Sequence, residues 1–217
     1  MGIFGVTDFG LFCGAVLLLN ATPGPDTAFI VGRSIAQGRQ AGLVSALGIS
    51  AGCCVHAVAS ALGLSALLAA SAVAFGAIKL AGGIYLIYLG VRMVLARKAD
   101  MAPASSVATF ETVPSRPLVT VFRQAMVTNL LNPKVALFFL SFFPQFVSPN
   151  ATDKTAALLL LGLTFLGLST VYGCMTALVA GTLARRMTAV DGVRLWLERA
   201  VGTAFIGLGA RIALARD

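Results

Sequence analysis

The chain has 217 residues, of which 58% are hydrophobic and only 11% charged, and its formal net charge is +8. A soluble domain normally carries about 25% charged residues, so the composition argues strongly against a soluble globule, and the high hydrophobicity excludes disorder. A membrane-spanning helix needs about 20 apolar residues, so the chain has room for about six spans and no separate catalytic domain. We therefore expect an all-α, multi-pass membrane protein.

Apolar stretches and their interruptions predict six helices. The first three are expected at residues 9–32, 41–68 and 74–95. The second three are expected at residues 120–147, 155–183 and 196–215. The polar stretch 96–119 contains three prolines and five charges, which indicates a loop joining two three-helix units, 1–95 and 120–217. No basic region precedes Asp8, so the first span is expected to be retained and not cleaved as a signal peptide.

The distribution of basic residues between the loops predicts the orientation. Loops 32–40, 96–119 and 184–194 share one side and carry eight Lys or Arg, whereas the other side has only Lys154 and Arg216. The positive-inside rule places the eight in the cytoplasm, so both termini are expected in the periplasm. The eight are Arg33, Arg39, Arg97, Lys98, Arg116, Arg185, Arg186 and Arg194. Because topology explains these charges, no nucleic-acid partner is expected.

Two segments of the chain resemble each other. Residues 80–97 and 199–216 are identical at nine of 18 positions, so the third helix resembles the sixth. Both the first and fourth helices contain a capping residue followed by proline in mid-span, at Thr22-Pro23 and Asn132-Pro133. Three helices are an odd number, so the second unit enters the membrane from the opposite side. This 3+3 inverted repeat is typical of secondary transporters, whose site lies where corresponding helices break.

The two proline motifs are expected to break their helices. Backbone groups freed by a proline are tolerated at membrane depth only where they face protein or a cavity. Thr22 and Asn132 are predicted N-caps, with Pro23 and Pro133 at the first helical position. Each break would then start a half-helix whose positive end attracts anions. A plain proline kink is the alternative at each position.

A charged residue lies at each expected break. A charge inside a span is costly and normally faces a cavity or a partner, so Asp26 and Lys134 could line one central site and, with no substrate, could pair directly or through water. An amino acid could place its ammonium on Asp26 and its carboxylate on the half-helix at Lys134. Asn20 and Asn129 could add hydrogen bonds. The alternatives are a structural cap for Asp26, a snorkelling Lys134, and helix-to-helix bonds for the asparagines. The candidate substrate-binding residues are Asn20, Thr22, Pro23, Gly24, Pro25, Asp26, Asn129, Asn132, Pro133 and Lys134.

Other features are assigned to packing. Cys53, Cys54 and His56 lie close together, but their spacing matches no known metal motif, and no cofactor or metal is expected. No nucleophile–base constellation indicates an enzyme. Gly48 and Gly52 form a small-residue face suited to helix packing, and such faces are compatible with a homodimer.

Three segments carry a family resemblance. Residues 20–52, 82–93 and 129–146 resemble the motifs of the lysine exporter family, including its threonine and homoserine efflux branch. The resemblance implies a bacterial inner-membrane exporter that moves amino acids outward, driven by the proton gradient, but it does not fix the substrate. It places the functional core on Pro23, Gly24, Pro25, Asp26, Asn132, Pro133 and Lys134. One departure is Ala21-Thr22 before the first of these prolines.

Two other functions compete with amino-acid export. Related families include heavy-metal exporters, for which Cys53, Cys54 and His56 would be the ligands. A membrane thiol redox conduit would need a disulfide, for which the adjacent Cys53 and Cys54 are poorly placed. In the favoured hypothesis Asp26 is the proton-coupling residue, because a proton on its carboxylate would release the substrate ammonium and then travel inward.

Overall fold

In a computed structural model, the described part of the chain is residues 5–22, 24–64 and 116–183, together with single positions between 80 and 95 and between 203 and 210. These residues form helices and no strand; the one β-type contact among them is an antiparallel bridge between Val6 and Val147. The all-helical prediction is therefore confirmed for this part of the chain.

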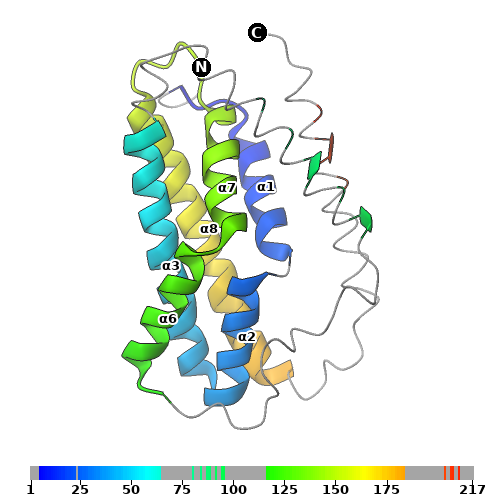
Figure 1. The fold of residues 1–217 in the computed structure, drawn as a ribbon, viewed down its shortest axis with the longest axis vertical. Coiled ribbons are helices and arrows are strands. Elements are labelled where there is room, and N and C mark those ends of the chain that lie inside the picture. The colour runs from blue at the N-terminus through cyan, green and yellow to red at the C-terminus, as the bar shows by residue number, and fades with distance from the viewer. Residues whose placement is uncertain are drawn as a thin grey trace.

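The first half of the chain forms two short helices and a long one (Figure 1). Helix α1 spans Phe9–Ala21 and α2 spans Pro25–Gln37, so the first predicted helix is broken and extends five residues further than expected. Helix α3 spans Arg39–Ala59 and continues as a π-helical turn, Ser60–Leu64. A glycine with φ 86°, Gly38, separates α2 from α3. This left-handed conformation reverses the chain in one residue at little steric cost.

The second half has a similar order of elements. Helix α6 spans Leu118–Leu130 and α7 spans Pro133–Phe142, followed by a 3₁₀ turn at Phe143–Phe146. Helix α8 spans Lys154–Leu183, within one residue of its predicted bounds. The fourth predicted helix is therefore broken, as expected, and its two parts are bent by 50°.

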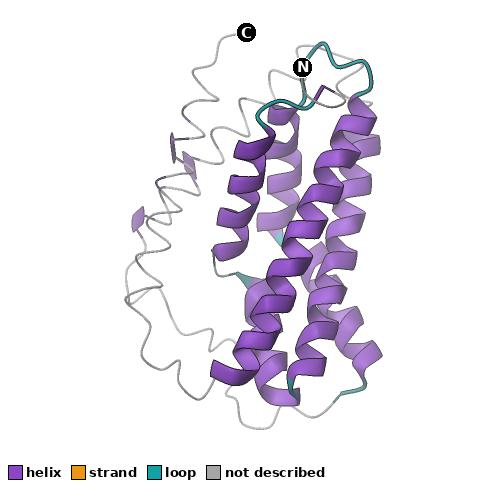
Figure 2. Ribbon diagram, turned by 180° about the vertical axis from the view of Figure 1, so that it is seen from behind, coloured by secondary structure: helices purple, strands orange, loops and turns teal. Residues whose placement is uncertain are grey.

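The two broken helices run in opposite directions across the bundle (Figure 1). Helices α1 and α7 lie at one end, α2 and α6 lie at the other, and the long helices α3 and α8 cross the whole length in opposite senses. Seen from behind, the loops lie at the two ends and at the breaks half-way along (Figure 2). Both breaks thus lie at the same level, near the centre of the bundle.

The described helices are those of a multi-pass membrane protein. Arg39–Gly63 and Lys154–Ala180 are each long and apolar enough to cross a membrane, and the bent α6–α7 pair adds a third candidate span. Apart from single positions, the predicted third and sixth helices and their repeated segments lie outside the described residues, as do most of the loop 96–119 and both chain ends. The count of six spans and the periplasmic termini therefore stay predictions.

Different packing holds the two ends of the bundle. At the α1–α7 end, phenylalanines interlock: the ring of Phe12 lies 5.4 Å from that of Phe143, and Phe139 lies 4.8 Å from Phe165 of α8. Along α3 the packing depends instead on small residues, as predicted. A Cβ at Gly48 would clash with the backbone of Phe122, so this glycine allows α3 and α6 to approach closely.

Candidate functional site

The first break separates α1 from α2 by three residues. Thr22 follows α1, and both its backbone N–H and its Oγ1 donate to the carbonyl of Leu18, at 3.1 and 2.9 Å. The N-cap of α2 is Gly24, and Pro25 takes the first helical position. The prediction that Thr22 is the N-cap is therefore wrong, because the second proline of the motif, and not the first, begins the helix. Pro23 lies outside the described residues.

The second break follows the prediction. Asn132 is the N-cap of α7, and its Oδ1 accepts a hydrogen bond of 3.1 Å from the backbone N–H of Lys134. Pro133 takes the first helical position, where its missing N–H costs nothing. The backbone N–H of Asn132 donates to the carbonyl of Asn129 at 3.0 Å, which closes the turn. The Asn132 side chain thus caps the helix that follows it.

Hydrogen bonds also connect the two breaks to each other. The Lys134 ammonium donates to the carbonyls of Leu19 and Thr22, at 2.8 Å each, and so holds the carboxyl end of α1. A cation is favourable there because it meets the negative end of the helix dipole. Asn129, in the last turn of α6, donates through Nδ2 to Asp26 Oδ2 at 2.7 Å. Asp26 and Lys134 thus each have a neutral hydrogen-bond partner, and their pairing through water stays a prediction.

Asp26 keeps one buried acceptor open. Its Oδ1 is buried and accepts no hydrogen bond from the described residues, and the same holds for Oδ1 of Asn129. Asn129 itself is fully buried. A buried acceptor without a donor costs about 1–3 kcal/mol, or more when it is charged, so such an atom calls for an explanation. One explanation is that a ligand or a bound proton supplies the missing hydrogen-bond donor.

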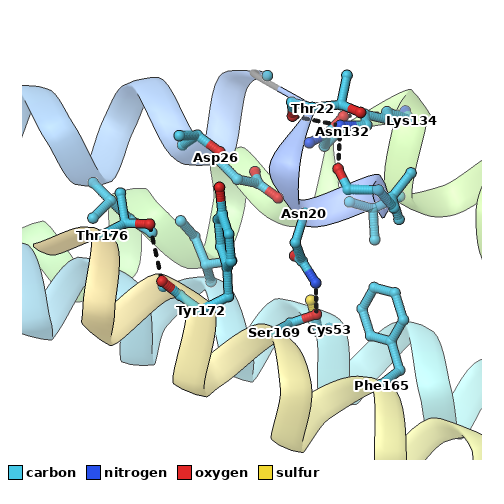
Figure 3. A pocket seen from close by; sticks show the side chains of 17 residues that line it. Asn20, Thr22, Asp26, Cys53, Asn132, Lys134, Phe165, Ser169, Tyr172 and Thr176 are labelled. Carbon is cyan, nitrogen blue, oxygen red and sulfur yellow. Dashed lines mark hydrogen bonds between the residues drawn. The ribbon is translucent and has the colours of Figure 1, made fainter. Parts of the chain in front are cut away.

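A cavity of about 50 Å³ lies between the two breaks and α8 (Figure 3). Six predicted residues line it: Asn20, Thr22, Gly24, Asp26, Asn132 and Lys134. Of the remaining candidates, Asn129 lies behind Asp26, and Pro25 and Pro133 set the helix starts. The apolar lining consists of Leu19, Ile30, Ile49, Val135 and Phe165.

Helix α8 supplies polar residues that the sequence analysis missed. Ser169, Tyr172 and Thr176 all line the cavity, and Ser169 accepts a hydrogen bond of 3.0 Å from Asn20 Nδ2. Figure 3 shows the Tyr172 ring reaching from α8 toward Asp26. Spacings of three and four residues place these side chains on one helix face. The available signal was therefore a polar stripe on a helix that carries no charge after Lys154.

The alternative metal site does not assemble. Cys53 is buried and lines the cavity, whereas Cys54 is exposed on another face of α3. His56 stacks on Phe139 at 5.7 Å. Within the described ranges, no three His, Cys, Asp or Glu side chains are placed to hold a metal ion.

Comparison with known proteins identifies the family. A family model described as LysE type translocator matches residues 17–216. The chain belongs to this family. An uncharacterized membrane protein of Pseudomonas aeruginosa is 33% identical and covers 99% of both chains. The leucine efflux proteins of Klebsiella pneumoniae and of an Enterobacter species are each 28% identical and cover 97% of this chain.

These matches extend over nearly the full length of the relatives, with 96% of the Klebsiella and 97% of the Enterobacter chain covered. Membership in a translocator family with such relatives supports the export of an amino acid or another small molecule by this LysE type translocator. No solved structure shows a significant match to the chain.

Proposed function

We propose that this translocator exports a neutral amino acid with an aliphatic side chain across the bacterial inner membrane, in exchange for protons. The observation that carries the proposal is the open, buried Oδ1 of Asp26, which lies at the break between α1 and α2 and beside the cavity. Two of the relatives are named leucine efflux proteins, which supports a neutral, aliphatic amino acid as the substrate.

The cavity offers a partner for each part of such a substrate. The α-ammonium would bind Asp26, the one acid among the cavity-lining residues. The α-carboxylate would bind N–H groups at the start of α2, together with hydroxyl groups of α8 such as Tyr172. The side chain would contact the apolar lining at Ile30 and Ile49. A basic side chain would find no second carboxylate there, which favours neutral substrates.

Asp26 can bind an ammonium or a proton, but not both. While it is ionised, its charge attracts the ammonium; when a proton occupies the carboxylate, this attraction is lost and the substrate leaves. The proton then travels inward with the empty carrier, which gives antiport. Asn129 serves as a positioning residue, because its 2.7 Å bond fixes the orientation of the carboxylate.

Transport requires the breaks to move. A cavity of about 50 Å³ holds a few water molecules but no amino acid, so the half-helices must separate to admit substrate. The contacts of Lys134 with α1 and of Asn129 with α2 cross between the two units and are the ones that must rearrange. We propose that six spans form a 3+3 inverted repeat about this site, with both termini in the periplasm.

The test is export from bacterial cells loaded with dipeptides. Cells that produce the protein should release leucine faster than empty-vector cells, and should release lysine and glutamate at the empty-vector rate. Asp26→Asn should abolish the gain. Asp153→Asn is the matched control, since Asp153 only caps α8 through a 2.8 Å bond to the N–H of Ala156. Equal export by the wild type and Asp26→Asn would overturn the proposal.

A further inference from the structure

A groove of about 510 Å³ opens between α2 and α6 and shares no lining residue with the central cavity. Phe29 of α2 forms one wall, and residues of α6 form the other: Arg123, Gln124, Val127 and Thr128. Helices α2 and α6 occupy the end of the bundle opposite α1 and α7 (Figure 1). The groove is thus polar and basic in part, with apolar side chains beside it.

Charge is unevenly divided between the two ends of the bundle. In the described part of the chain, the α2–α6 end carries Arg33, Arg39, Arg116 and Arg123. The described acids lie elsewhere: Asp8 and Asp153 precede α1 and α8 at the opposite end, and Asp26 lies at the central break. The end that carries the groove is therefore strongly positive, and the positive-inside rule assigns it to the cytoplasmic leaflet.

Neutral partners hold Arg33 beside the groove. Arg33 donates through Nη2 to Gln124 Oε1 at 2.8 Å and through Nη1 to Gln37 Oε1 at 2.6 Å. Gln37 in turn donates through Nε2 to the carbonyl of Arg116 at 3.0 Å. Amide and carbonyl oxygens orient a guanidinium without cancelling its charge. The positive field of Arg33 therefore remains at the groove.

Arg123 occupies an unusual position on α6. Residues 119, 123 and 127 lie on one helix face, and the two flanking valines are 64% and 47% exposed, as lipid-facing side chains are. Arg123 is itself exposed, a little more than one turn inside the start of α6. A charge on a lipid-facing stripe is costly unless it reaches the interface or meets an anion.

We propose that this groove binds the phosphate headgroup of an anionic phospholipid. Arg123 contacts the phosphate directly, Arg33 and Arg116 add to the attraction, and the acyl chains run from there toward the bundle centre along Val127. A lipid fits better than a soluble phosphate because an apolar, exposed stripe continues from the basic site. Basic pockets between membrane helices on the cytoplasmic side bind lipid headgroups in this way. The inference does not depend on which substrate is exported.

The test is native mass spectrometry of the purified full-length protein, titrated with phosphatidylglycerol or phosphatidylcholine. A basic residue near the surface contributes roughly a fivefold change in affinity for an anionic lipid. Phosphatidylglycerol should bind at least about tenfold more tightly than phosphatidylcholine. Arg123→Gln should weaken phosphatidylglycerol about fivefold, whereas Arg123→Lys should stay close to the wild type.

Arg39→Gln is the matched control, because Arg39 lies exposed at the same end but does not line the groove. It should weaken the affinity clearly less than Arg123→Gln does, because salt screens an exposed charge that does not contact the phosphate. An equal loss in Arg39→Gln and Arg123→Gln would show only diffuse attraction and overturn the proposal. Equal binding of the two lipids, or displacement of the lipid by soluble glycerol phosphate at similar concentration, would overturn it as well.

Discussion

The two helix breaks look alike in sequence but differ in what they leave open. At the second break, the side chain of Asn132 caps its own helix, and Lys134 reaches across to α1. At the first break, the N-cap is Gly24, which has no side chain to offer, and Asp26 keeps a buried oxygen without a donor. The comparison teaches that one break mainly supports the structure, while the other leaves its polar groups available to a ligand.

Removing the Lys134 ammonium should break this arrangement most severely. Lys134→Met leaves the Thr22 carbonyl without its described donor and the Leu19 carbonyl with only the Thr22 N–H, at 3.3 Å, and bonds to charged groups contribute about 1.5–3 kcal/mol each. We expect a loss of about 2–4 kcal/mol in unfolding free energy, measured by denaturant titration in detergent. Lys154→Met, at the start of α8, should change it by less than about 0.5 kcal/mol. Unchanged stability in Lys134→Met would show that the ammonium does not stabilise the fold and would contradict this prediction.

Gly52 packs against Asn129, whose hydrogen bond to Asp26 connects the two breaks. A Cβ there would lie 2.6 Å from Asn129 Oδ1 and 2.8 Å from its Cβ, so Gly52→Ala must displace Asn129 from Asp26. Such overpacking costs about 1–3 kcal/mol. We expect lower thermal stability together with slower leucine export.

Gly167→Ala provides the control for this substitution. Gly167 lies on α8, and a Cβ there would meet nothing within 4 Å. Alanine in a helix interior is favoured over glycine by roughly 0.5–1 kcal/mol, so stability should rise slightly and export should be unchanged. If Gly52→Ala behaves like Gly167→Ala, the packing behind Asn129 has no functional role.

The smallest expected losses of stability distinguish the two N-cap residues, Asn132 and Gly24. Asn132→Ala removes the side-chain acceptor for the N–H of Lys134 and should cost about 1 kcal/mol, which Asn132→Ser should largely restore. Gly24→Ala should cost less, about 0.5 kcal/mol, because no side-chain bond is lost, its φ of −159° suits any residue and its new Cβ would lie 3.7 Å from Lys134. Thermal unfolding of the three variants measures the difference. Equal losses at Asn132 and Gly24 would contradict the contrast between the breaks.

Local chemistry in the sequence predicted the breaks, but it could not predict what they contact. Proline and asparagine fix a helix start within a few residues, so Asn132 and Pro133 were assigned correctly. Thr22 was assigned wrongly because the motif has two prolines and either could begin the helix. The bonds from Lys134 to α1 and from Asn129 to Asp26 join residues more than 100 positions apart. They depend on how the helices rotate against each other, which uniformly apolar spans do not reveal.

The polar face of α8 illustrates the same limit in another way. Ser169, Tyr172 and Thr176 have the spacing of one helix face, yet hydroxyl groups within a span often bond to their own backbone. Thr176 does so here, donating to the carbonyl of Tyr172 at 2.9 Å. Only the position of the cavity shows which of these side chains face it.

The measurement that tests the central claim most directly is proton movement in proteoliposomes. Liposomes that contain the purified protein and a pH-sensitive dye receive a leucine gradient. The wild type and Asp153→Asn should move protons against the direction of leucine flow. Asp26→Asn, reconstituted in equal amount, should move none. Proton movement at the wild-type rate in Asp26→Asn would show that the coupling group is not Asp26, and would contradict the account.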